Sequence, residues 1–568
     1  MMAKNSKKNE LKFYQKLILN NYLLKKFGAD SFKDISESIK SPLCEEISND
    51  GTTGFYEKLK NKYMLISKEK LQEYDLNIVS HLEKINYKRE DKIKLKYFQY
   101  LSLLFVEYYL DMYFNHRKEL LKELKNFLHD FNMQYPKDIL DDYEEKDLNK
   151  IALWNATGSG KTLLMHINYH QYKHYSNKLE DGASFILLTP KEGLSKQHIE
   201  DFSYSNIPAE IYNKALSRGL TYNKDTIQII ENTKLADKDG EKTVATSRFG
   251  NKNVVFVDEG HRGSSGNTWN KYRNELCEDG FSFEYSATFG QAVAGNNELL
   301  NEYAKCIIFD YSYKYFYSDG YGKDYNILNL QEDEKNVSLR KTYLTAALVS
   351  FYQQKKIFTE KKQDCLKFNI DNPLMIFVGS SVNAVKKEKG KEVSDVVDIV
   401  SFYNDFIKNR NESINNIKKV MEHTTGIIDS QTRDIFRNSF EYLEELNLKP
   451  EYIFDDILKI VFNCNTKSSV LHIDNMKGID GEILLRLGEN EPFGLINVGD
   501  DNKLMKLFDK DYRFFKTHRS CIVNLDNIVS FDISNNIIRF KDKEINLVSR
   551  SNKRILKDKL TDKYKVFK

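Results

Sequence analysis

A glycine-rich segment has the residue types that bind a nucleoside triphosphate. Its members are Ala156, Thr157, Gly158, Ser159, Gly160, Lys161 and Thr162. Glycines let backbone N–H groups approach phosphate oxygens, lysine reaches the β- and γ-phosphates, and a threonine hydroxyl binds Mg²⁺ at a helix start. The apolar run Ile151–Trp154 precedes the segment and Leu163–Met165 continues it, which is the strand, loop and helix order that such a loop requires. The sequence therefore predicts a site for ATP and Mg²⁺.

Two acidic residues, Asp258 and Glu259, directly follow a second apolar run, Val254–Val257. In nucleotide hydrolysis an aspartate at such a position holds Mg²⁺, and a glutamate orients and deprotonates the attacking water. Taken alone, acidic residues at a strand end are common on protein surfaces. Their place downstream of the glycine-rich loop favours the catalytic interpretation, with His261 two residues further on.

Three weaker motifs lie in the same part of the chain. Ser286, Ala287 and Thr288 follow the predicted strand Phe283–Tyr285, and Thr189 and Pro190 follow the apolar run Phe185–Leu188. Gln99 lies upstream of the loop. Each has an ordinary structural interpretation, as a strand-to-turn transition or a surface glutamine, and each gains weight only from its order in the chain.

The elements that carry these motifs alternate between short apolar runs and helical stretches. This alternation predicts an α/β domain with a parallel sheet, whose functional residues follow the carboxyl ends of the strands. We place this domain at residues 94–314, after a helical N-terminal region at 1–93. Leu95–Phe127 has the periodicity of two helices.

The rest of the chain has a different pattern. Leu344–Phe358 predicts a helix, Leu374–Val378 predicts a buried strand, and Val385–Leu448 is mostly helical and highly charged. Val470–Val498 is a short β-like segment. We assign residues 315–506 to a second α/β domain, and the β-hairpin-like residues 507–568, without a helix before Asn552, to a tail.

The motifs together resemble those of superfamily 2 helicases, and of the type III restriction enzyme helicase family in particular. The resemblance covers about residues 1–506 and rests on Tyr97–Leu101, Val257–Gly263 and Gly280–Phe289. It implies two RecA-like domains, ATP hydrolysis with Mg²⁺, and translocation on double-stranded DNA. It further implies that Gln99 reads adenine and that Thr189 and Pro190 contact DNA. His261 and Ser286–Thr288 would couple the ATP site to DNA binding.

One element of that family is missing. Its second domain carries a Gln-x-x-Gly-Arg-x-x-Arg motif whose arginines stabilise the transition state. This chain contains no Gly-Arg dipeptide, and Gln431, Arg433 and Arg437 have the wrong spacing. We therefore expect a truncated second RecA-like domain and impaired ATP hydrolysis.

The tail resembles the second half of a LytTR DNA-binding domain. The resemblance covers about residues 507–560 and rests on Arg513–Ile528 and Ile545–Ile555. It implies a compact β fold in which His518, Arg519 and Arg550 contact DNA, since arginine bonds guanine edges bidentately. The alternative is that they are ordinary surface cations, because residues 503–568 hold 17 Lys and Arg against 8 Asp and Glu.

Composition limits the remaining possibilities. The whole chain has a net charge of only +3, so the basic tail ends a mildly acidic body. Six cysteines without metal-ligand spacing indicate reduced thiols, and no apolar segment is long enough to span a membrane. We expect a cytoplasmic protein without a membrane partner.

Three functional hypotheses follow from the sequence. The first is an ATP-dependent DNA helicase or translocase, the motor subunit of a restriction or phage-defence system, with a modification or specificity subunit as partner. The second is a DNA-binding regulator of the LytTR type. The third is a recombined product that binds ATP without motor activity.

Overall fold

The structure is a computed structural model. It describes residues 11–176, 184–190, 192–213, 225–240, 243–259, 267–322, 337–368, 370–377, 385–388, 391–429, 431–464, 470–475, 482–497, 514–518, 521–525, 528–533, 535–539, 544–545 and 548–563. The chain divides into two compact units, Met1–Tyr325 and Asn326–Lys568.

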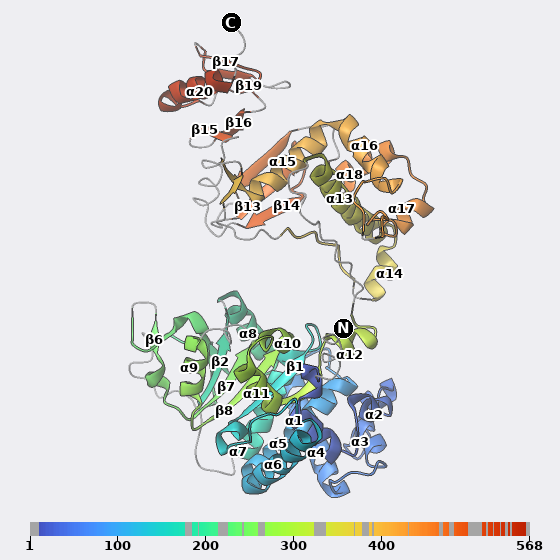
Figure 1. Ribbon diagram of the computed structural model, residues 1–568, viewed down its shortest axis with the longest axis vertical. Coiled ribbons are helices and arrows are strands. Elements are labelled where there is room, and N and C mark those ends of the chain that lie inside the picture. The colour runs from blue at the N-terminus through green and yellow to red at the C-terminus, as the bar shows by residue number, and fades with distance from the viewer. Residues whose placement is uncertain are drawn as a thin grey trace, which may run out of the picture. The chain divides into compact units, whose positions relative to one another are not determined.

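A parallel sheet of seven strands forms the centre of the first unit (Figure 1). Its strands in spatial order are β3 (Ala209–Ile211), β4 (Ile227–Glu231), β2 (Ser184–Thr189), β7 (Asn253–Asp258), β8 (Phe281–Ser286), β1 (Lys150–Asn155) and β9 (Ile307–Tyr311). Every pairing in this sheet is parallel. The predicted strands at Ile151–Trp154, Phe185–Leu188, Val254–Val257 and Phe283–Tyr285 are therefore confirmed, and so is the parallel α/β fold of this unit.

Helices that follow the strands cover the sheet. They are α7 (Lys161–Ser176), α8 (Glu192–Tyr204), α9 (Asn267–Leu276), α10 (Phe289–Ala292), α11 (Asn297–Cys306) and α12 (Tyr313–Ser318). Two short strands, β5 (Leu235–Ala236) and β6 (Val244–Ala245), pair with each other outside the main sheet. Buried strands of continuous apolar residues need helices on both faces to exclude water, and this alternation supplies them.

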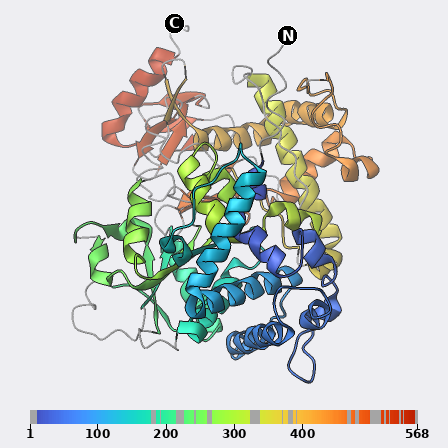
Figure 2. The same cartoon turned by 60° about the horizontal axis from the view of Figure 1, so that its bottom comes forward.

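The N-terminal helices belong to the same compact unit as the sheet. They are α1 (Ile18–Lys26), α2 (Phe32–Glu37), α3 (Gly54–Leu59), α4 (Lys68–Asn86), α5 (Tyr97–Asn115) and α6 (Arg117–Gln134). The two helices predicted within Leu95–Phe127 are thus confirmed as α5 and α6. Helix α5 is buried on nearly all sides, because α4, α6, α7 and strand β9 pack around it. The blue N-terminal helices lie beside these elements in both views (Figure 1, Figure 2).

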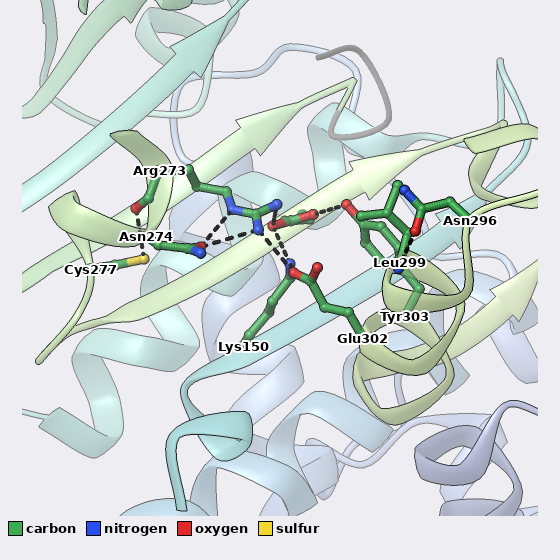
Figure 3. Close-up of polar contacts among 9 residues, drawn as sticks. Lys150, Arg273, Asn274, Cys277, Asn296, Leu299, Glu302 and Tyr303 are labelled. Atoms are coloured by element: carbon green, nitrogen blue, oxygen red, sulfur yellow. Dashed lines mark hydrogen bonds and ion pairs between the residues drawn. The ribbon is translucent and has the colours of Figure 1, made fainter. Parts of the chain in front are cut away.

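A buried network of charges ties strands β1 and β8 to helices α9 and α11 (Figure 3). Arg273, only 1% exposed, lies 2.6 Å from Glu284 and 2.9 Å from Glu302. Lys150 pairs with the same two carboxylates, and the Tyr303 hydroxyl donates to Glu284 at 2.8 Å. Burial alone would raise the pKa of Glu302, but the charges of Lys150 and Arg273 outweigh it and lower that pKa to about 2. The network fixes the central strands that carry the site.

The second unit contains mostly helices packed on a small antiparallel sheet. The helices are α13 (Val337–Glu360), α14 (Lys362–Lys367), α15 (Asp395–Lys408), α16 (Arg410–Met421), α17 (Glu441–Glu445) and α18 (Pro450–Ile460). The sheet has three strands, β12 (Leu471–Asn475), β13 (Glu482–Leu487) and β14 (Gly494–Asn497), and a separate hairpin joins β10 (Val385–Glu388) to β11 (Lys391–Ser394). The helix expected within Leu344–Phe358 and the β-like segment Val470–Val498 are confirmed.

The prediction of a buried strand at Leu374–Val378 is wrong for its described residues. Leu374–Phe377 have no regular secondary structure, and Leu374 is 79% exposed. An apolar run becomes a strand only where a neighbouring strand pairs with it, and the described strands of this unit pair antiparallel among themselves. Val385–Leu448 is also less helical than expected, because it contains the β10–β11 hairpin. The assignment of 315–506 to a truncated RecA-like domain stays a prediction.

The tail folds as short strands followed by one helix. The strands are β15 (Phe514–His518), β16 (Cys521–Asn524), β17 (Ser530–Asp532), β18 (Ile537–Arg539) and β19 (Glu544–Ile545), and the helix is α20 (Arg550–Lys563). A small apolar core joins β18 to α20, made of Leu525, Ile528, Ile538, Val548, Leu556 and Leu560. The predicted β-rich tail is confirmed, although its helix begins two residues earlier than expected. Among the described residues, every helix is too short or too polar to cross a lipid bilayer.

Candidate nucleotide-binding site

The glycine-rich loop connects the end of β1 to the start of α7, as the sequence predicts. Gly158 and Gly160 have φ angles of +86° and +93°, a backbone region that residues other than glycine rarely adopt. The Ala156 N–H donates to the Tyr311 carbonyl at 2.9 Å, and the Ser159 hydroxyl donates to the Ala156 carbonyl at 2.7 Å. These bonds hold the loop over the first turn of α7, where N–H groups of the helix remain for an anion.

Gln99 contacts this loop from helix α5. Its side-chain amide donates to the Ser159 carbonyl at 3.0 Å and accepts from the Lys96 N–H at 2.9 Å. A Cβ atom on Gly160 would lie 2.6 Å from the Gln99 Nε2, so the glycine is needed for space as well as for conformation. The structure therefore places Gln99 at the site, while its contact with adenine stays a prediction.

Asp258 is the last residue of β7, and Glu259 follows it with its side chain close to the loop. The Glu259 carboxylate is 3.8 Å from the Lys161 ammonium, measured between Oε1 and Nζ. Glu259 has a φ of +57°, an uncommon conformation for a residue with a side chain, and such outliers cluster at functional sites. His261, predicted to couple ATP and DNA, lies outside the described residues.

The four predicted motifs follow four neighbouring strands. In spatial order β2, β7, β8 and β1 are adjacent, and all four run in the same direction. Thr189 and Pro190 lie at the carboxyl end of β2, and Asp258 and Glu259 at that of β7. Ser286–Thr288 lie at the carboxyl end of β8, and the glycine-rich loop follows β1. Register pairs Trp154 with Ser286 and Asp258 with Tyr285, so the strand ends lie level with one another. One edge of the sheet thus gathers residues from widely separated parts of the chain.

The segment Ser286–Thr288 bonds directly to the strand that carries the loop. The Trp154 indole donates to the Ala287 carbonyl at 3.0 Å, and the buried Ser286 hydroxyl accepts from the Thr288 N–H at 3.0 Å. A shift of this segment would therefore move Trp154, which lies two residues before the start of the glycine-rich loop. The coupling role of these residues stays a prediction.

Thr189 has a different environment from the one that its predicted DNA contact would suggest. Its side chain is fully buried, and its hydroxyl lies 2.7 Å from the Ser195 hydroxyl of α8. Pro190 beside it is half-buried. The Thr189 hydroxyl is therefore engaged by Ser195. The predicted DNA contact then applies to the adjoining backbone and to Pro190.

His198 on α8 also belongs to the site, although the sequence does not predict it. Its Nε2 lies 3.1 Å from the Asp258 carboxylate, and the side chain is only 4% exposed. Nearby, burial lowers the pKa of His166 to about 3, and the neighbouring His198 adds to the effect. A single sequence gives no signal for such a contact, because the histidine and the aspartate lie on different elements.

The residues gathered here fit ATP and Mg²⁺ by their chemistry. Asp258 and Thr162 offer a carboxylate and a hydroxyl, the hard oxygen ligands that Mg²⁺ prefers, together with phosphate oxygens. Lys161 and the N-terminal end of α7 offer positive charge to phosphates, and the two glycines leave room for them. Glu259 supplies a carboxylate that could accept a proton from water.

In the tail, the predicted DNA contacts can be placed only in part. His518 is the last residue of β15 and Arg550 the first of α20, and Arg519 lies outside the described residues.

Two family models match this chain. The model described as type III restriction enzyme, res subunit, matches residues 112–291, and the model described as LytTr DNA-binding domain matches residues 501–561. Both predicted resemblances are thus confirmed, although the first covers far less than residues 1–506. The first match includes the loop, Asp258 and Glu259, and Ser286–Thr288, but not Gln99. Residues 112–291 are therefore similar to the res subunit of type III restriction enzymes.

Solved structures give a weaker likeness. The SWI2/SNF2 ATPase core of Sulfolobus solfataricus in complex with double-stranded DNA is 14% identical, over 45% of this chain and 60% of that one, with a TM-score of 0.22. The Hef helicase domain of Pyrococcus furiosus is 14% identical, over 55% and 65%, with a TM-score of 0.22. The chain covers less than two thirds of either structure. No curated protein matches the chain.

Proposed function

We propose that this chain is an ATP-binding motor protein that acts on double-stranded DNA, as the motor subunit of a restriction or phage-defence system. The observation that supports it most is the alignment of the glycine-rich loop, Ser286–Thr288, and Asp258 with Glu259 on three neighbouring strand ends. Lys161 binds the β- and γ-phosphates, Thr162 and Asp258 hold Mg²⁺, and Glu259 takes the proton of the attacking water.

The isolated chain hydrolyses ATP slowly. Phosphoryl transfer depends mainly on positioning and on positive charge around the γ-phosphate. The first unit provides Lys161 and the ligands of Mg²⁺, but the chain has no Gly-Arg dipeptide that could correspond to the arginine motif of the family. An arginine of this kind contributes on the order of 10³-fold or more in rate. A partner chain could supply the missing charge.

The partners of the motor are double-stranded DNA and a modification or specificity subunit, in the cytoplasm. DNA contacts come from the segment around Pro190 and from the tail, where His518, Arg519 and Arg550 match the contact positions of the LytTR family. A basic segment attracts the phosphate backbone regardless of base sequence, so the tail adds affinity even where it reads no bases.

A second candidate function is a DNA-binding regulator of the LytTR type. The small core of the tail and the match over residues 501–561 favour it. In that case the first unit would bind ATP without acting as a motor, as it would in a recombined product of two unrelated proteins. DNA binding by the tail is common to all these functions, so only nucleotide turnover separates them.

Steady-state phosphate release from the purified chain, with and without duplex DNA, tests the proposal. We expect slow release that disappears in Glu259→Gln, and little stimulation by DNA. ATP binding with no phosphate release above that of Glu259→Gln would favour the regulator or the recombined product instead. Fast release that DNA stimulates and Glu259→Gln abolishes would show that another residue replaces the arginines.

A further inference from the structure

The contact between His198 and Asp258 has a defined chemistry. A carboxylate only accepts hydrogen bonds, so the His198 Nε2 at 3.1 Å must carry the hydrogen and donate it to Oδ2 of Asp258. Within the described residues the other ring nitrogen, Nδ1, has no hydrogen-bond partner. The bond to Asp258 is therefore the polar contact that sets the tautomer of this ring, and it leaves Oδ1 of the carboxylate for a metal ion.

Helix α8 holds this imidazole firmly in place. Near the start of the helix, the Ser195 hydroxyl bonds that of Thr189 at 2.7 Å, and both residues are buried. Near its end, the Phe202 ring stacks on His166 with centroids 4.4 Å apart and also contacts His198 at 6.1 Å. Because the helix is fixed at both ends to β2 and α7, the imidazole is oriented before any ligand binds.

We propose that His198 is a positioning residue, which holds the Asp258 carboxylate in the orientation that binds Mg²⁺ for the nucleotide. The proposal rests on the proposed function, because it takes Asp258 as the metal ligand. Side chains that orient a metal ligand through a hydrogen bond typically change metal affinity 10- to 100-fold when they are removed. His198 acts on the metal through Asp258 and touches no reacting atom.

Magnesium titrations of nucleotide binding test this role without requiring turnover. A fluorescent ATP analogue is bound to the full chain in EDTA and then at rising Mg²⁺ concentrations. His198→Ala should raise the Mg²⁺ concentration at half-saturation by about 10- to 100-fold and leave binding in EDTA unchanged. His198→Gln should restore most of the affinity, because its amide N–H can donate to Asp258. Tyr204→Ala, on an exposed position of the same helix, is the matched control and should behave as wild type.

Two results would overturn the proposal. If His198→Ala and wild type had the same Mg²⁺ dependence, the bond would have no bearing on the metal. If His198→Ala weakened binding equally in EDTA and in Mg²⁺, or His198→Gln failed to rescue, the histidine would act only in packing. Failure of the nucleotide site itself looks different, because wild type would then bind no nucleotide under any condition, and both proposals would fall together.

Discussion

The ammonium of Lys161 and the carboxylate of Glu259 lie 3.8 Å apart, although β8 separates β1 and β7, the strands that precede these two residues. The first residue follows β1 and the second follows β7, so their proximity depends on the parallel order of the central sheet. A cation for phosphates and a base for water thus meet at one edge of the sheet before any ligand is present.

Glu259→Gln should separate nucleotide binding from hydrolysis. The amide keeps the shape of the side chain but cannot take a proton from water, so ATP binding should remain and residual hydrolysis should be lost. Equilibrium binding and phosphate release on the same preparation measure the two properties. Turnover at the wild-type rate in the variant would exclude Glu259 as the base.

Gly160→Ala should strongly weaken nucleotide binding. The new Cβ would lie 2.6 Å from the Gln99 Nε2, and a φ of +93° is unfavourable for alanine. Gly193→Ala is the matched control, because nothing lies within 4 Å of its added Cβ and the residue is not confined to positive φ. Affinity for a fluorescent ATP analogue should fall in the first variant and stay unchanged in the second. Equal affinities would mean that Gln99 and the loop do not form this contact.

Arg273→Met should destabilise the first unit by about 3–5 kcal/mol, because it leaves the buried Glu284 carboxylate without one of its cations. Thermal or denaturant unfolding measures the loss. A variant as stable as wild type would show that Lys150 alone neutralises both carboxylates of the network.

The same network predicts how stability depends on pH. The pKa of Glu302 is lowered to about 2 in the folded chain, so its contribution is fully present above its ordinary value and is lost as pH falls towards 2. The stability difference between wild type and Glu302→Gln should therefore shrink as the medium is acidified. A difference that stayed constant with pH would contradict the ion pairs of Glu302.

The tail should bind DNA in a manner that depends steeply on salt. From Lys503 onward it carries nine more positive than negative charges, and each phosphate contact releases counterions. Affinity of the full chain for duplex DNA should fall linearly with salt on logarithmic axes, and a chain that ends before Lys503 should lose much of that slope. A footprint on one specific sequence, unaffected by Arg519→Ala and Arg550→Ala, would contradict the assigned contacts.

The strand ends of the site could be predicted because of their local chemistry. A buried parallel strand is a continuous apolar run, and polar residues must follow where it reaches the surface. Val254–Val257 before Asp258 and Ile151–Trp154 before the loop both have this form. Their order in the chain then indicated that they would share one edge of a sheet.

Other features could not be predicted because they depend on packing between distant elements. His198 reaches Asp258 from a different helix, and Arg273 meets Glu284 and Glu302 inside the protein. A sequence alone predicts that charged residues of this kind lie on the surface, because such residues are rarely buried without a partner. The prediction of a strand at Leu374–Val378 is wrong for the opposite reason: the apolar run has no strand to pair with, and Leu374 is exposed.

The most direct test of the account is the binding of an ATP analogue with Mg²⁺ to wild type and to Lys161→Ala. Lys161 supplies the main side-chain charge for the β- and γ-phosphates, and charge-assisted contacts of this type are individually strong. We predict saturable binding by wild type and its loss in Lys161→Ala, with both proteins unfolding at the same temperature. Equal affinity in the two proteins would contradict the assignment of the nucleotide to this loop, and with it the proposed function.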